Sequence, residues 1–106
     1  MGLAKVDMPK IVRVGVHPYS ILRKQKGQMG DNLGNCDGNV LQISVAKRLK
    51  KTVAQETLLH EVMHACNYPS FLGKENITEE DIVNACAPVL LQTLRENPQL
   101  VAYLLS

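Results

Sequence analysis

The sequence predicts an α+β fold, in which a small, mostly antiparallel sheet of three or four strands is followed by a motif-bearing helix and one or two further helices. Two observations support this class. One run rich in β-branched residues and three further short strand-like runs, separated by turn signals, lie between residues 10 and 45, and apolar residues recur at helical spacing from about residue 52 onward. A length of 106 residues with 45% hydrophobic content indicates one domain, residues 1–106.

The first two strands are expected to form a hairpin. Residues 10–16 are rich in β-branched side chains, which favour extended structure. Pro18 restricts His17 to extended or turn geometry, so the chain is expected to turn there. Residues 19–25 then return as the second strand.

A further pair of strands follows a glycine-containing connection. Residues 33–36 predict a short strand, and Asp37-Gly38 is a strong signal for a tight turn. Residues 39–45 predict the next strand, because apolar and polar side chains alternate toward its end. The basic connection after it, residues 46–51, is better explained as a solvated loop and helix start than as a nucleic-acid patch.

The first helical pattern runs from about Thr52 to Asn67. Thr52 is the expected N-cap, and Gln55 three residues later completes a capping-box pattern. The first proline after this pattern is Pro69. A helix of about four turns is therefore expected, ending shortly before that proline.

A second helix is expected to begin at Thr78. The acidic residues 79–81 follow it, where the helix dipole favours negative charge. Pro88 lies inside the apolar pattern and predicts a kink or a break. Residues 99–105 predict a short terminal helix or a tail.

The most informative feature is the H-E-x-x-H motif formed by His60, Glu61 and His64 on the first predicted helix. Residues four apart lie on one helix face, so both imidazoles can coordinate a single Zn²⁺ ion. Glu61 points beside that metal, which suits a general base for a water molecule that the zinc activates. The motif predicts metal-assisted hydrolysis, most often of a peptide bond. The alternative is a surface helix with two incidental histidines.

A catalytic zinc needs a third protein ligand. His17 is the only other histidine, and Asn67 and Phe71 stand where the longer motif H-E-x-x-H-x-x-G-x-x-H has its glycine and third histidine. A carboxylate from residues 79–81 is therefore expected to complete the site. The alternative is that these three acids only complement the helix dipole.

Composition argues against several other classes. The net charge of +2 is too small to indicate a nucleic-acid partner, and no apolar run approaches the length of a membrane span. The first residues lack the apolar segment of a signal peptide. Three cysteines without a C-x-x-C pair predict reduced thiols and a cytoplasmic location.

Residues 57–65, 80–85 and 91–98 together resemble small phage-encoded zincin metallopeptidases, similar to the ImmA/IrrE-type group. The likeness extends from Lys10 to Asn97. It implies a minimal zincin-like domain acting as a zinc metallopeptidase in the cytosol of a phage host. Position relative to the following Val-x-Ala implies Glu80 as the third zinc ligand, with Glu79 as runner-up and Asp81 third.

The expected peptidase assigns a role to each candidate residue. His60, His64 and Glu80 hold Zn²⁺, and Glu61 takes a proton from water and passes it to the leaving amine. Tyr68 and His17 are candidate donors to the oxyanion, although a structural role is the alternative for each. A protein or peptide substrate is expected to add as a strand along a sheet edge, for which residues 40–45 are a candidate.

The competing hypothesis is not enzymatic. A short phage-type chain can keep the zincin fold and its zinc and still act as a binding module that sequesters a host or phage protein without catalysis. A purely structural zinc is a third hypothesis, and Glu61 argues against it because a structural site has no need of a base.

Overall fold

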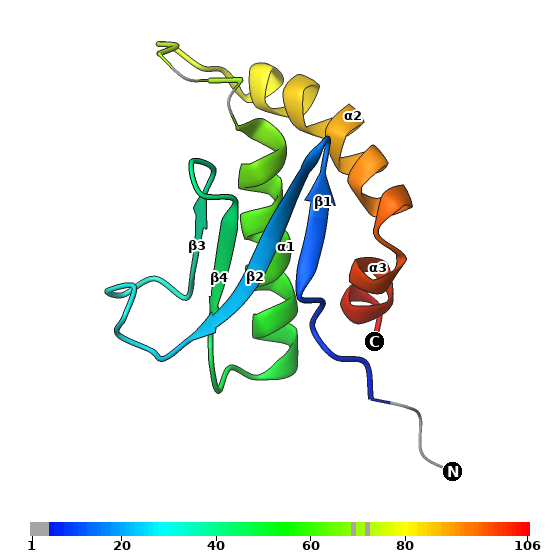
Figure 1. Cartoon of the computed structure of the whole chain (residues 1–106). Helices are drawn as coiled ribbons and strands as arrows, with labels where there is room; N and C mark the ends of the chain where they lie inside the picture. The colour runs from blue at the N-terminus through cyan, green and yellow to red at the C-terminus, as the bar shows by residue number, and fades with distance from the viewer. Residues whose placement is uncertain (1–4, 69, 72) are drawn as a thin grey trace.

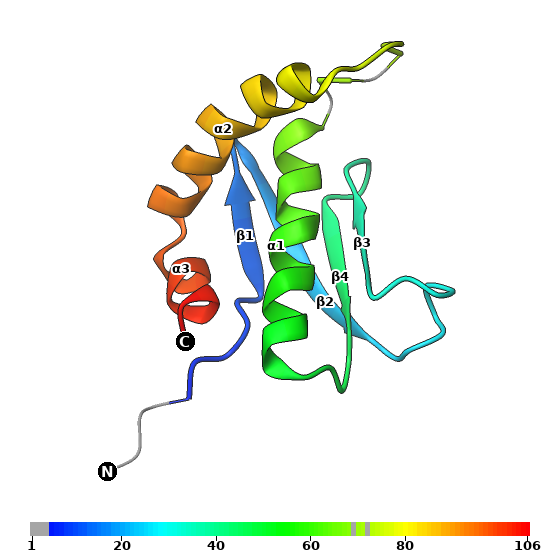
Figure 2. The same ribbon diagram turned by 180° about the vertical axis from the view of Figure 1, so that it is seen from behind.

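The structure is a computed structural model that describes residues 5–68, 70, 71 and 73–106. Its four strands form one sheet, and α1 crosses one face of that sheet with α2 beside it (Figures 1 and 2). The elements are β1 (Ile11–Val14), β2 (His17–Lys24), β3 (Gly34–Asp37), β4 (Gln42–Ala46), α1 (Lys51–Asn67), α2 (Glu79–Glu96) and α3 (Pro98–Leu104). The predicted α+β class is confirmed.

The sheet is mixed, with the strand order β1-β2-β4-β3. β1 pairs antiparallel with β2, and β3 pairs antiparallel with β4, with Cys36 opposite Ile43. β2 and β4 are parallel, with Ile21 opposite Ile43. Because β4 is hydrogen-bonded on both sides, the expectation that residues 40–45 offer an edge to a substrate is wrong. The edges are β1 and β3.

Asn97 covers the outer edge of β1. Its Oδ1 accepts a hydrogen bond from the backbone N–H of Arg13 at 2.9 Å, and its Nδ2 donates to the carbonyl oxygen of Arg13 at 2.8 Å. The amide therefore pairs with the strand much as a neighbouring strand does, at the junction between α2 and α3. β3 is the edge strand that lies beside α1.

The core lies between the sheet and the helices. Val12 and Val14 alternate with exposed residues along β1, and Ile43–Ala46 is buried throughout, as expected of a central strand. Leu58 and Val62 of α1 complete this packing without any exposure. Cys66 and Cys86 are small buried core residues, as predicted, and all three cysteines are free.

The start of α1 differs from its prediction. Lys50 is the N-cap and its side chain makes no capping hydrogen bond, so the capping box predicted for Thr52 and Gln55 is wrong. Gln55 instead donates from Nε2 to the carbonyl oxygen of Tyr103 in α3 at 2.8 Å. The Gln55 side chain therefore makes a tertiary hydrogen bond instead of a local capping hydrogen bond. Pro69, expected just beyond the helix, lies outside the described residues.

α2 begins after the N-cap Thr78, as predicted, and continues through Pro88 to Glu96. Of the predicted kink or break at Pro88, the break is therefore wrong. Pro88 and Asn84, four residues earlier, are both exposed, so water can satisfy the carbonyl that loses its helical partner. Among the described residues, no helix combines the length and apolar character needed to cross a membrane.

Candidate metal centre

His60 and His64 project side by side from an exposed face of α1. Their Nε2 atoms are 3.1 Å apart, and their ring planes meet at 70°. Two imidazoles on one tetrahedral zinc, each bonded at about 2.05 Å, have nitrogens roughly 3.3 Å apart. The pair therefore fits one zinc ion with little rearrangement. A hydrogen bond between two neutral imidazoles in suitable tautomers gives a similar separation.

Glu61 lies at the boundary between α1 and β3, with only 6% of its surface exposed. Its carboxylate, together with a ring nitrogen of each histidine, forms a group in which all three atoms lie within 4.8 Å of one another. Burial raises the pKa of Glu61, and the nearby His60 and His64 partly oppose that rise. The carboxyl is therefore a stronger proton acceptor than an exposed glutamate.

β3 approaches α1 closely at Gly34. A β-carbon at this position would lie 2.7 Å from Cγ2 of Thr57 and 2.8 Å from Oε2 of Glu61, so a side chain here requires a shift of the helix side chains or of the strand. Sequence reasoning passed over Gly34. The available signal was a glycine inside a predicted strand, which often marks the close approach of another segment.

A hollow of about 260 Å³ lies between β3 and α1, beside His60. It is lined by Asn32, Leu33, Gly34, Val53, Glu56, Thr57, His60 and Glu61. The general-base candidate and one metal-ligand candidate thus share an accessible cavity that is bounded by the free edge of the sheet.

Cys36, which lies on β3, is also near Glu61. Burial, the carboxylate of Glu61 and then that of Asp37 raise the pKa of the Cys36 thiol to about 11. Cys36 is therefore a neutral thiol at neutral pH and is a poor nucleophile there. It is not part of the group of metal-ligating atoms around His60.

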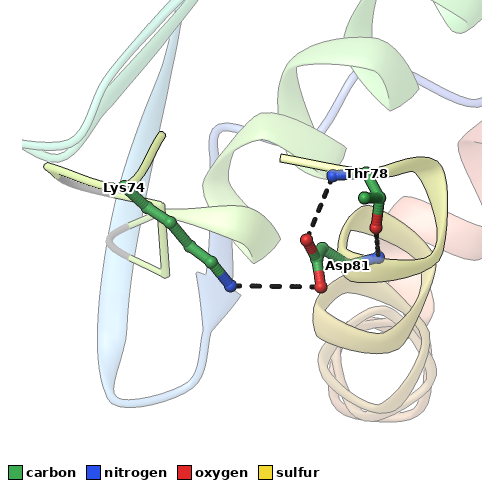
Figure 3. A network of polar contacts seen from close by, with 3 residues as sticks. All are labelled: Lys74, Thr78 and Asp81. Atoms are coloured by element: carbon green, nitrogen blue, oxygen red, sulfur yellow. Dashed lines mark hydrogen bonds and ion pairs between the residues drawn. The ribbon is translucent and has the colours of Figure 1, made fainter. Parts of the chain in front are cut away.

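The acidic turn 79–81 lies at the start of α2. Asp81 accepts a hydrogen bond from the backbone N–H of Thr78 at 3.0 Å, its own N–H donates to Oγ1 of Thr78 at 3.1 Å, and Lys74 pairs with it at 3.9 Å (Figure 3). Asp81 is thus engaged in capping. Glu80 is exposed and, within the described chain, is not among the atoms gathered at His60 and His64. Its role as third ligand stays a prediction.

Tyr68 and His17 lie together at a different hollow, of about 430 Å³, near the C-terminal end of α1. The Tyr68 hydroxyl donates to Oδ1 of Asn39 at 2.8 Å, and His17 is the exposed first residue of β2. Neither residue lines the cavity of His60 and Glu61. The structure brings the two predicted oxyanion donors near each other but does not place them beside the general base.

Comparisons with protein-family models, curated proteins and solved structures find no match to this chain.

Proposed function

We propose that the protein is a zinc metallopeptidase of the zincin type, in which His60, His64 and Glu80 hold the metal and Glu61 is the general base. One observation carries the proposal: the two imidazole nitrogens lie 3.1 Å apart, and the buried carboxylate lies in the same group within 4.8 Å. Two neutral nitrogen ligands beside a shielded base are the donor set that zinc-dependent hydrolysis needs.

A zinc ion bound at this group supplies polarisation of the scissile carbonyl and acidification of water. Glu61 accepts the proton of the attacking water and delivers it to the leaving amine. Burial raises the pKa of Glu61, so its carboxylate accepts the proton of water more readily than an exposed glutamate does.

β3 and the hollow beside it support a peptide as the substrate. Only one side of β3 is paired within the sheet, and the hollow between β3 and α1 contains both His60 and Glu61. An extended peptide adding to the free side of β3 is held by main-chain hydrogen bonds. This edge replaces residues 40–45 as the expected place of strand addition.

The alternative is a zinc-containing binding module that sequesters a host or phage protein. The observation that favours it is the position of Glu80, which lies outside the group of metal-ligating atoms in the described chain. A site with two histidines and no third protein ligand binds zinc more weakly than a complete site and is less well suited to catalysis.

The variant Glu61→Gln separates the two functions. Glutamine has nearly the shape of glutamate but cannot accept a proton at neutral pH, so cleavage is expected to fall by roughly 10²–10⁴ while zinc content stays the same. Proteome-wide mapping of new N-termini, after incubation with each protein, measures this difference. Glu75→Gln is the matched control, because Glu75 is exposed and is not among the metal-ligating atoms grouped around His60.

Cleavage products that depend on wild-type protein and persist with Glu75→Gln support the peptidase. Identical N-termini for wild type and Glu61→Gln contradict it. A biological effect that survives Glu61→Gln intact favours the sequestering module.

A further inference from the structure

Six of the twelve lysines and arginines gather where β2 and β4 end and α1 begins, at the lower end of the molecule in Figure 1. β2 and β4 are parallel, so their C-terminal ends meet, and the backbone N–H of Lys47 donates to the carbonyl oxygen of Lys24 at 2.7 Å. We call this set the basic end: Lys24, Lys26, Lys47, Arg48, Lys50 and Lys51.

Among the described residues, no acid forms an ion pair with the basic end, although Asp7 lines a hollow together with Lys51. Within the part of the chain that the structure describes, the ion pair found joins Lys74 to Asp81, beyond the opposite end of α1. α1 also begins without an acidic residue in its first turn, so the helix dipole adds to the same sign. Lys26, Lys47 and Arg48, with Gln25, line a polar hollow of about 340 Å³. These cations are arranged around a space that suits negative groups.

The basic end adjoins the cavity of the metal centre. Leu33 lines that cavity, and its carbonyl oxygen accepts a hydrogen bond from the N–H of Ala46 at 2.8 Å. Leu33 therefore lies next to Lys47, the residue of the basic end that follows Ala46. Along the axis of α1, the distance from His60 back to the start of the helix is about 14 Å, although Lys51 itself lies on the opposite side of α1 and lines a different hollow with Tyr103. An extended peptide covers that distance in roughly four residues.

The wall of the cavity between His60 and the basic end includes apolar side chains and an acidic one. Leu33 and Val53 line it and are partly exposed, at 41% and 36%, so they offer apolar contact. Glu56 lies in the same wall and repels an acidic side chain placed there. The cavity therefore favours apolar residues over acidic ones near the metal centre, whereas the basic end favours acidic residues farther along.

We propose that the basic end selects protein segments that carry a run of acidic residues about four positions from the bond presented to His60, Glu61 and His64. The proposal rests on the peptidase function and names its substrate class: an extended segment with an uncharged centre and an acidic flank. The basic end binds the acidic flank, and the length of α1 between its first residue and His60 sets the separation between that flank and the central bond.

Fluorescence anisotropy with labelled peptides tests the docking. The probe has a central leucine and a block of four glutamates that begins four residues away, and a second peptide has glutamines in that block. Binding is measured on zinc-loaded Glu61→Gln protein, which prevents cleavage. The triple change Lys26→Gln, Lys47→Gln and Arg48→Gln is compared with the matched control Lys10→Gln, Arg13→Gln and Arg95→Gln, which removes equal charge from exposed positions on and beside β1 and α2.

The basic-end variant is expected to weaken binding of the glutamate peptide about ten-fold, through the loss of three exposed ion pairs, whereas the control changes it less than two-fold. Moving the glutamate block to one or eight residues from the leucine is expected to weaken binding as well. Equal losses in the two triple variants would show a general charge effect and overturn the proposal.

Two other occupants are outcomes of the same experiment. Tighter binding of a 12-nucleotide single-stranded DNA than of the glutamate peptide, lost in the basic-end variant, would assign the surface to nucleic acid instead. Self-association at low salt that Glu79→Gln with Glu80→Gln abolishes would assign it to the acidic turn of a second copy. Either result overturns the proposal.

The failure of this inference is distinguishable from the failure of the peptidase. Glu61-dependent cleavage at sites without acidic enrichment contradicts the basic end as a selector and leaves the peptidase intact. Docking of the glutamate peptide without any Glu61-dependent cleavage contradicts the peptidase and leaves the basic end as a surface that binds acidic protein segments.

Discussion

Gly34 of β3 lies against the carboxylate of Glu61 on α1, so that a β-carbon on Gly34 would be 2.8 Å from Oε2 of Glu61. The space that the carboxylate of the general-base candidate occupies therefore depends on the absence of a side chain at Gly34, 27 positions earlier in the chain. Gly34, His60 and Glu61 all line the same cavity.

Gly34→Ala is expected to lower the free energy of unfolding by about 1–3 kcal/mol, because the added methyl group overlaps Thr57 and Glu61. Urea denaturation measures the change. The neighbouring Asn35→Ala serves as control, since Asn35 is exposed on the same strand. Alanine normally stabilises a strand relative to glycine, so a Gly34→Ala protein as stable as wild type would contradict the close contact.

Cys36 reports the charge on Glu61. With a pKa of about 11, raised by burial and then by the Glu61 carboxylate, its alkylation by iodoacetamide is expected to accelerate about ten-fold per pH unit between pH 8 and 10. Glu61→Gln removes a negative charge that disfavours the thiolate, so it lowers the pKa of Cys36 and speeds alkylation at pH 9. Mass spectrometry of the Cys36 peptide gives the rate.

Glu56→Gln is the control for that experiment, because it removes the same charge from the exposed surface of α1. Glu56 is not among the groups that raise the pKa of Cys36. Equal acceleration by both variants would mean that Glu61 is not the charge that Cys36 senses.

Glu80→Gln is expected to weaken zinc binding by at least ten-fold, and Glu79→Gln to leave it within about two-fold. Adjacent helical residues point roughly 100° apart, so only one of the two can face the metal. Asp81→Asn is less informative, because Asp81 also caps α2 through Thr78. Competition with a chromogenic zinc chelator measures each affinity, and equal affinities for the Glu79 and Glu80 variants would overturn the assignment.

Local signals in the sequence predicted much of the fold. A β-branched run located β1, and Thr78 followed by Asp81 located the start of α2, because both signals act over a few residues. The turn predicted at His17-Pro18 was wrong, because the chain turns at residues 15–16 and both His17 and Pro18 belong to β2. The parallel pairing of β2 with β4 was not predictable in this way. It arises because β4 inserts between β2 and β3, and no local pattern specifies which strands become neighbours.

The same difference between local signals and tertiary packing applies to the candidate site. His60, Glu61 and His64 lie within one helix turn, so their spacing alone predicted their proximity. The contribution of Gly34 and the separation of Tyr68 from the cavity depend on how β3 and α1 pack, which is a tertiary property. The third ligand depends on the segment between α1 and α2, whose path the motif does not determine.

Zinc titration of the purified protein, with metal-free wild type compared with His64→Ala and His17→Ala, tests the central claim most directly. His17 is the matched control, because it is the chain's only histidine outside the motif and is exposed. We expect wild type and His17→Ala to bind about one zinc ion per chain with equal affinity, and His64→Ala to bind at least 100-fold more weakly, because it loses one of the imidazole ligands. Zinc binding by His64→Ala that matches wild type, or no zinc binding by the wild type, would contradict a metal centre at His60 and His64.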